Sequence, residues 1–176
     1  VDYIFAGDSA TQELSLDELL CLQTWAGRRH NLDSLSVAGN GQIVMRDSLT
    51  RKVIYRTSFS SLFQEWQSTE EATRLRRSFE NVFLLPMPKR AAELSVTLFD
   101  THRKPLARLN HYVNPKDILI RNLSNAPKHE YKYIWRGGSP DTCIDVAVVA
   151  EGYTVSEMKK FYERAEETAQ SLFAAE

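Results

Sequence analysis

The sequence predicts a mainly β protein: an antiparallel β-sandwich with one or two short helices, followed by a strand–helix unit from the start of an α/β domain. Several short segments alternate apolar and polar residues between turn formers, which is typical of a sandwich. Only residues 60–77 interrupt them with helical character. After a Gly- and Pro-containing break at 137–141, one continuous apolar run and one amphipathic stretch follow.

The first strand is predicted at the start of the chain. Apolar Val1, Tyr3 and Phe5 recur at every second position, and Gly7-Asp8 follows as a turn. Ser15 and Glu18 then have the spacing of a capping box, and several leucines follow. A short helix and a strand are both compatible with that segment.

Two hairpins are predicted further along. Apolar stretches at 43–45 and 53–55 flank a polar turn. Residues 93–99 alternate strictly, with one apolar and one polar face, and residues 107–113 alternate again after a charged turn. Both pairs are therefore expected to form antiparallel ladders.

Residues 60–77 lie between the hairpins and are expected to hold one or two short helices. Thr69 is the predicted N-cap of one of them, with Glu70 and Glu71 in its first turn. Residues 79–85 form a strand candidate that is closed by two prolines, because proline ends ladder pairing.

The last segment has a different character. Residues 143–150 are almost wholly apolar, which predicts a strand buried on both faces of a parallel sheet. Thr154 and Glu157 form a capping box, and one apolar stripe follows on a helix. A strand of this type needs sheet neighbours and helices on both sides, whereas the sequence supplies one helix. We therefore expect a chain that stops inside a second domain, with this unit docked, swapped or partly disordered.

These observations divide the chain into a sandwich domain at 1–124, a linker at 125–141 and the truncated start of an α/β domain at 142–176. Residues 131–135 alternate aromatic and polar side chains within the linker, as an edge strand does. The net charge of −1 argues against a nucleic-acid partner, which requires a large positive excess. No apolar run approaches the ~18 residues of a transmembrane helix. Cys21 and Cys143 have apolar neighbours, which favours two free buried thiols over a disulfide.

The residues reveal no constellation for catalysis. The four histidines do not form a His-Glu-x-x-His zinc motif, and no nucleophile elbow or phosphate-binding loop occurs. We assign no catalytic, cofactor-binding or metal-binding residue to this chain. His111 is expected to be a satisfied core or interface histidine, and Glu65 a solvated helix residue. Four aromatic residues are candidates for a binding platform, although core or interdomain packing is favoured for them: Trp66, Tyr131, Tyr133 and Trp135.

Several stretches together resemble one family, the bacterial immunoglobulin-A-type zinc metallopeptidases. The segments 2–7, 25–27, 59–72 and 79–89 are similar to its N-terminal domain, with Phe-Ser-Ser-Leu-Phe-Gln-Glu-Trp at 59–66 as the best match. Residues 144–162, with Ala-Glu-Gly-Tyr-Thr at their centre, resemble the first strand and helix of the catalytic domain.

The resemblance implies a secreted, cell-surface or periplasmic bacterial protein that cleaves peptide bonds with a zinc-activated water. The zinc-binding helix of that family lies downstream, so zinc is expected in the parent protein and not in this chain. This chain is then a non-catalytic accessory domain that supports or orients its own catalytic domain. The alternative is a β-sandwich binding module that captures a host protein or glycan through exposed aromatics.

Overall fold

A computed structural model describes residues 1–35, 37–123, 130–139 and 142–174 of the chain. It divides into two compact units, Val1–Ala126 and Pro127–Glu176. This division falls inside the segment 125–141, for which we predicted a linker. Each unit is described by itself below.

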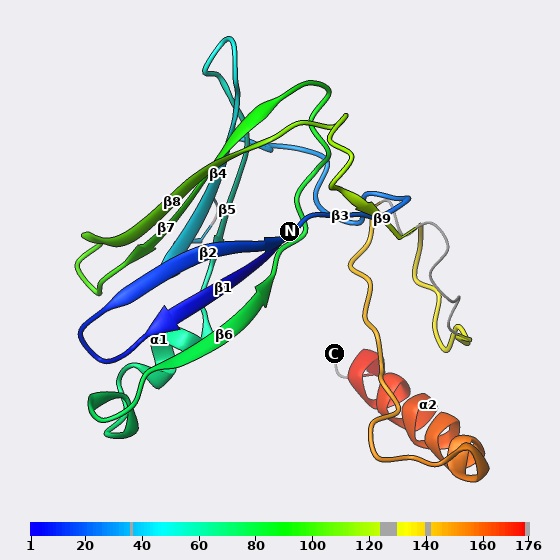
Figure 1. Cartoon of the computed structure of the whole chain (residues 1–176). Helices are drawn as coiled ribbons and strands as arrows, with labels where there is room; N and C mark the ends of the chain where they lie inside the picture. The colour runs from blue at the N-terminus through cyan, green and yellow to red at the C-terminus, as the bar shows by residue number, and fades with distance from the viewer. Residues whose placement is uncertain (36, 124–129, 140–141, 175–176) are drawn as a thin grey trace. The chain divides into compact units, whose positions relative to one another are not determined.

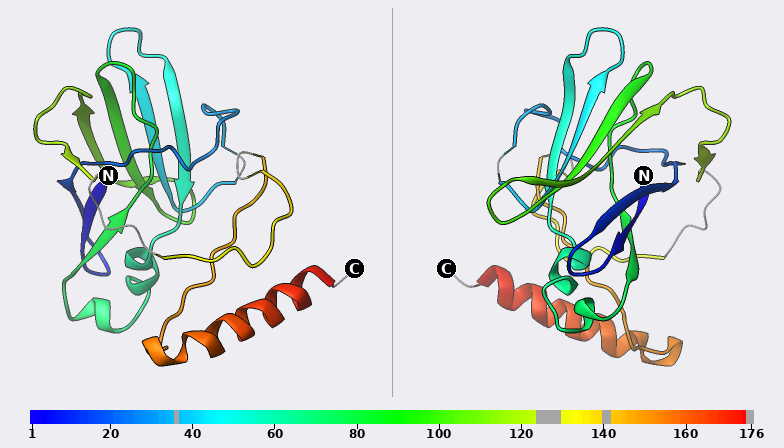
Figure 2. Two further views of the ribbon diagram at one scale, coloured as in Figure 1. Left: turned by 90° about the vertical axis from the view of Figure 1, so that its right-hand side faces the viewer. Right: turned by 60° about the vertical axis from the view of Figure 1, so that its left-hand side comes forward.

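The first unit consists of two antiparallel sheets, as predicted (Figures 1 and 2). In the three-stranded sheet the order is β2-β1-β6, and in the four-stranded sheet it is β5-β4-β7-β8. A two-residue parallel ladder joins β3 to β9. The strands are β1 (Asp2–Gly7), β2 (Gln12–Glu18), β3 (Leu20–Cys21), β4 (Gly41–Asp47), β5 (Val53–Phe59), β6 (Arg77–Val82), β7 (Ala92–Phe99), β8 (Pro105–Val113) and β9 (Arg121–Asn122).

The core lies between the two sheets and is made by alternate residues of their strands. Tyr3 and Phe5 of β1 are fully buried. They pack in one cluster with apolar side chains of β4, β7 and α1: Ile43, Met45, Phe63, Leu94, Val96 and Leu98. Because successive side chains of a strand point to opposite faces, the period-two pattern of 93–99 is enough to place its apolar set in this core.

Both predicted hairpins are confirmed. The ladder of β4 with β5 pairs Ile43 with Thr57, and that of β7 with β8 pairs Val96 with Leu109. The segment at Ser15, where helix and strand were both compatible, is strand β2, in which Ser15 pairs with Ile4 of β1. The neighbouring strand supplies long-range backbone hydrogen bonds that a short isolated helix would not have.

The connection from β5 to β6 contains the two short helices that were expected, α1 (Leu62–Trp66) and the 3₁₀-helix η1 (Glu71–Thr73). Ser61 caps α1, since its Oγ accepts a hydrogen bond from the Gln64 N–H at 3.3 Å. The predicted cap at Thr69 is wrong, because Thr69 Oγ1 donates to the Trp66 carbonyl at 2.8 Å and so closes the preceding helix. The predicted strand 79–85 is β6, shifted toward Arg77.

The second unit contains η2 (Val155–Glu157) and α2 (Met158–Ala174). The predicted capping role of Glu157 is confirmed, because its Oε2 accepts from the Thr154 N–H at 3.0 Å. The predicted strand at 143–150 is not formed, nor is an edge strand at 131–135. Ile144 is 93% exposed, since the described residues of this unit contain no strand to pair with it. Within the described chain, no helix is long and apolar enough to cross a bilayer.

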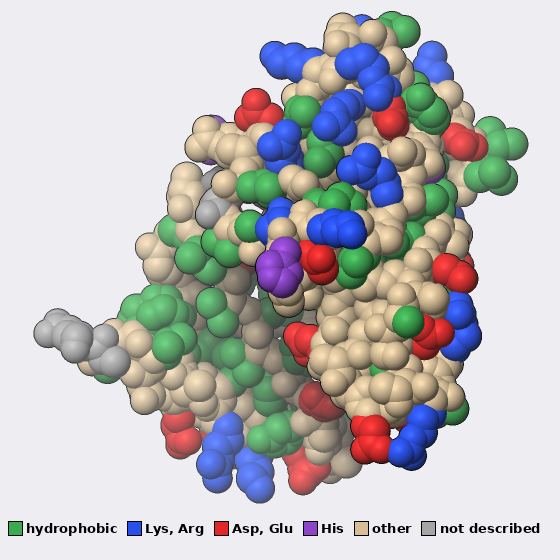
Figure 3. Space-filling view, turned by 90° about the vertical axis from the view of Figure 1, so that its left-hand side faces the viewer, with side chains coloured by type: hydrophobic (Ala, Val, Ile, Leu, Met, Phe, Trp, Pro, Cys, Tyr) green, Lys and Arg blue, Asp and Glu red, His purple; other side chains and the backbone are tan. Residues whose placement is uncertain are grey.

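The outer face of the four-stranded sheet is polar and rich in arginine. Figure 3 shows Lys and Arg side chains gathered in the upper half of that view, over this sheet. The outward positions of its strands alternate with the buried ones, and they include Gln42, Arg46, Arg56, Glu93, Ser95, Thr97, Arg108, Asn110 and Tyr112.

Candidate functional site

One concavity of the first unit is an apolar groove. Its volume is about 450 Å³, a size typical of ligand pockets. Met45, Leu94 and Val113 reach it from the sandwich core. Two segments line the rest together with Val1 and Ile120: residues 19–26, which include the two-residue strand β3, and residues 83–88.

Local sequence features hold both segments outside the two antiparallel sheets. Pro86 and Pro88 cannot donate to a ladder, so pairing ends after Phe83, whose N–H donates to the Val1 carbonyl at 2.9 Å. In the other segment, the Trp25 Nε1–H donates to the Arg28 carbonyl at 3.0 Å. The Trp25 ring meets the Tyr55 ring edge-on at 5.9 Å between centroids. The groove is therefore shaped by anchored loops.

Polar groups in this groove are few. They include the Cys21 thiol, which lies 3.6 Å from the Leu22 carbonyl, and the side chains of Gln23 and Thr24. Cys21 and Cys143 are both free, as favoured from the sequence, but neither is fully buried, since Cys21 is half-buried and Cys143 is exposed. The predicted burial of Cys143 fails because this residue begins the segment 143–150, which has no strand partner among the described residues. The groove can hold apolar groups and offers no activated nucleophile.

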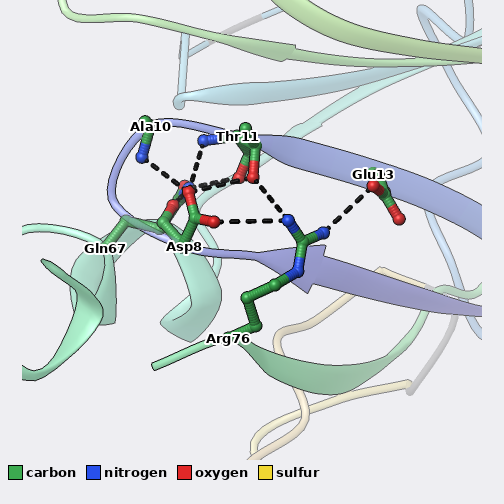
Figure 4. Close-up of polar contacts among 6 residues, drawn as sticks. All are labelled: Asp8, Ala10, Thr11, Glu13, Gln67 and Arg76. Carbon is green, nitrogen blue, oxygen red and sulfur yellow. Dashed lines mark hydrogen bonds and ion pairs between the residues drawn. The ribbon is translucent and has the colours of Figure 1, made fainter. Parts of the chain in front are cut away.

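A polar cluster fastens the β1–β2 turn to the connection after α1 (Figure 4). Asp8 Oδ1 accepts from the N–H groups of Ala10 and Thr11 at 2.9 and 2.8 Å, and these bonds, the Ala10 bond foremost, lower the pKa of Asp8. Arg76 bridges Asp8 and Glu13 at 3.3 and 3.0 Å.

Gln67 joins this cluster from the end of α1. Its Nε2 donates to the carbonyls of Asp8 and Thr11, the latter at 3.2 Å. Because every charged member already has protein partners, the cluster is a structural clamp on the turn.

The Glu-Trp segment has a structural role as well. The Trp66 ring packs against Phe63 and Phe79, with centroids 6.2 and 5.5 Å away. Its Nε1–H donates to Glu71 Oε2 at 2.7 Å. Glu65 is exposed, which confirms its reading as a solvated helix residue. The most distinctive motif of the sequence thus anchors α1 to β6.

The other candidate platform aromatics lie in the second unit. Tyr131 and Tyr133 contact each other edge-on at 5.5 Å and are 77% and 53% exposed. Trp135 stacks on Phe173 of α2 at 5.2 Å. Trp66 belongs to the first unit, so the four do not form one platform on either unit.

The described histidines lie in separate environments. His111 Nε2 hydrogen-bonds Tyr3 Oη at 2.7 Å, so it contacts the core as predicted, but its Nδ1 is buried without a hydrogen-bond partner and the ring is only partly satisfied. Burial lowers the pKa of His111. His102 and His30 are exposed, and His129 lies outside the described residues. Among the described residues, no group of three or more His, Cys, Asp or Glu side chains is placed to hold a metal ion.

The family follows from a comparison with protein-family models. The model of the peptidase M64 N-terminus matches residues 1–110. The chain belongs to this family. The match runs from β1 into β8 and so covers strands of both sheets. The first unit is therefore the N-terminal domain of a metallopeptidase family. No curated protein gives a significant match to the chain.

The apolar groove was not predicted from the sequence. Its walls come from segments 19–26 and 83–88, whose leucines follow neither the strand nor the helix period. The sequence feature that could have indicated the groove is the set of apolar residues next to Pro86 and Pro88, which follow neither the strand nor the helix period. The groove itself depends on how two distant loops meet over the core, which spacing does not encode.

Proposed function

We propose that the chain is the non-catalytic N-terminal part of a secreted bacterial zinc metallopeptidase of the immunoglobulin-A-peptidase type. In this proposal, the first unit supports or orients the catalytic domain of the parent protein. The family match over residues 1–110 carries the proposal, because it identifies an N-terminal domain of a peptidase family.

The second unit supports the same proposal. Ile144, Val146 and Val149 are 93%, 68% and 79% exposed, although their sequence pattern is that of a doubly buried strand. Burial of each such side chain stabilises a fold by about 1.5–3 kcal/mol. Sheet neighbours from a catalytic domain would provide that burial.

Zinc chemistry belongs to the parent protein in this proposal. The described residues do not fit a zinc site. His111 hydrogen-bonds Tyr3 in the core, and His102 lies in an exposed turn without other metal-ligand side chains placed beside it. No catalytic step is therefore assigned to a residue of this chain.

A binding module is the second candidate function. The exposure of Tyr131, Tyr133 and Trp135 favours it, because exposed aromatic rings can capture a host protein or a glycan. Here the second unit, and not the sandwich, would make the contact.

Deletion of residues 1–126 from the parent protein separates the two candidates. Loss of an orienting domain should lower the Tm of the catalytic domain and kcat/KM for both a short peptide and a protein substrate. A second variant keeps the whole parent protein and replaces Tyr131, Tyr133 and Trp135 by alanine. If these residues form a binding module, this variant should have a higher KM for the protein substrate and an unchanged KM for the short peptide. An unchanged Tm and activity after deletion would refute the orienting role.

A further inference from the structure

The outer face of the four-stranded sheet presents arginines from three different strands. Arg46 on β4 lies opposite Glu93, Arg56 on β5 lies opposite Val44, and Arg108 on β8 lies opposite Thr97. Neighbouring strands lie about 4.8 Å apart, so β5 and β8, at the two edges, are separated by about 14 Å. The positive charges are thus spread across the whole width of the sheet.

Arg56 and Arg108 lack a carboxylate partner among the described residues, whereas Arg46 interacts electrostatically with Glu93 across the ladder of β4 and β7. None of the three arginines forms a salt bridge with a described residue, and Arg108 Nε donates a hydrogen bond to Thr97 Oγ1 at 3.2 Å. Arg56 Nε is buried without a hydrogen-bond partner. The one carboxylate at the outward positions of these strands, Glu93, is paired with Arg51.

The composition of this face is that of a protein interface. Arginine and tyrosine are enriched in such interfaces, whereas lysine is depleted. Tyr112 is 64% exposed at one end of the face, and Val44 is only 8% exposed near its centre. A guanidinium also matches a carboxylate in bidentate geometry, which an ammonium does not.

We propose that this face docks a carboxylate-rich segment of a partner protein, a role that goes beyond support of the catalytic domain. Such a segment would cross the strands and place acidic side chains against Arg46, Arg56 and Arg108. A nucleic acid fits less well, because the chain as a whole has a net charge of −1 and phosphate binding draws on a larger positive excess.

The test measures the binding of a fluorescein-labelled decaglutamate peptide to the whole chain by fluorescence anisotropy, at pH 7 and low salt. Replacement of Arg46, Arg56 and Arg108 by glutamine should weaken binding by at least about tenfold, since three ion pairs are lost. The double variant Arg46→Gln/Arg108→Gln leaves the partly buried Arg56 in place and should still weaken binding by about fivefold. Higher salt should weaken binding to the unmodified chain.

The matched control removes the same number of positive charges elsewhere, as Lys89→Gln/Lys116→Gln/Lys160→Gln, at side chains that form no salt bridge with a described residue. These side chains are exposed and lie outside the four-stranded sheet. The control should change the affinity less than about twofold. Equal losses for the two triple variants, or no binding of decaglutamate to the unmodified chain, would overturn the proposal. Tighter binding of duplex DNA or of phosphatidylserine vesicles than of decaglutamate would overturn the choice of a protein partner.

Discussion

Tyr3 Oη lies 2.7 Å from His111 Nε2 and joins the two sheets of the first unit across their core. Tyr3 belongs to the central strand β1 of one sheet, and His111 to the edge strand β8 of the other. Tyr3 is fully buried, and burial raises the pKa of its hydroxyl. Among the described residues, His111 Nδ1 is buried without a hydrogen-bond partner, so Tyr3 is the one side chain that hydrogen-bonds this ring.

Tyr3→Phe should lower the free energy of unfolding by about 1–3 kcal/mol, because it removes a buried hydrogen bond and leaves His111 unsatisfied. Urea denaturation followed by tryptophan fluorescence measures the change. Tyr112→Phe is the matched control, since Tyr112 is 64% exposed, and it should change stability by less than about 0.5 kcal/mol. Equal effects of the two variants would contradict the inter-sheet role.

The stability of the first unit should depend on His111 at mildly acidic pH. Burial lowers the pKa of His111 in the folded state, so the unfolded chain binds a proton more readily. Stability is then full above the ordinary histidine pKa of about 6.5 and falls as the pH drops below it. Urea denaturation at intervals from pH 8 to pH 5 measures the slope. His111→Gln should flatten this slope, whereas His102→Gln, at an exposed turn, should leave it unchanged.

Asp47→Asn should destabilise the β4–β5 hairpin. Asp47 Oδ1 accepts from the N–H groups of Leu49 and Thr50 at 3.1 and 2.8 Å, and the carboxylate also pairs with Arg90. The Arg90 bond is the largest cause that holds the pKa of Asp47 well below its usual range. The contribution of Asp47 is therefore present above the ordinary aspartate pKa and is lost as the pH falls through the lower folded value.

Thermal unfolding at pH 7 should show a lower Tm for Asp47→Asn than for the unmodified chain, and the difference should shrink as the pH falls through the acidic range. Asp33→Asn, at an exposed loop position, is the control and should leave the Tm in place. A pH-independent difference would indicate that the charge of Asp47 contributes nothing.

Gly7→Ala should disrupt the β1–β2 turn. Gly7 has a φ of +152°, and a Cβ there would lie 2.0 Å from the Thr11 carbonyl oxygen. Backbone would have to move, so we expect a loss of about 1–3 kcal/mol in the free energy of unfolding, measured by urea denaturation. Gly137→Ala is the control, because a Cβ there would lie 3.7 Å from Trp135 Nε1, an ordinary contact distance, and it should be close to neutral.

The sandwich could be predicted because its signals are local. The alternation at 93–99 places the apolar face of β7, and the turns at 48–52 and 100–105 set the two hairpins. Strand β2 could not be separated from a helix, because a capping-box spacing competes with the pattern until pairing with β1 decides. Local spacing does not contain that long-range contact.

The candidate site could be predicted only in part. The position of His111 on the apolar face of a predicted strand indicated that it contacts the core. Its partner Tyr3 is 108 residues away in sequence, so the hydrogen bond between them could not be predicted. The arginine face needed the sheet order β5-β4-β7-β8, which brings Arg46, Arg56 and Arg108 onto one surface. Sequence alone showed a nearly neutral chain and so concealed this local concentration of charge.

Most side chains of the segment 143–150 are exposed in this chain. Val146 and Val149 are 68% and 79% exposed, so Val146→Ser/Val149→Ser should leave the free energy of unfolding of this chain unchanged within about 0.5 kcal/mol. Light scattering should also show less aggregation, since exposed apolar side chains promote association. In the parent protein, the same double variant should lower the Tm of the catalytic domain, because two side chains of a buried strand would become polar. An unchanged Tm in the parent would refute the proposal that this segment is a buried strand of that domain.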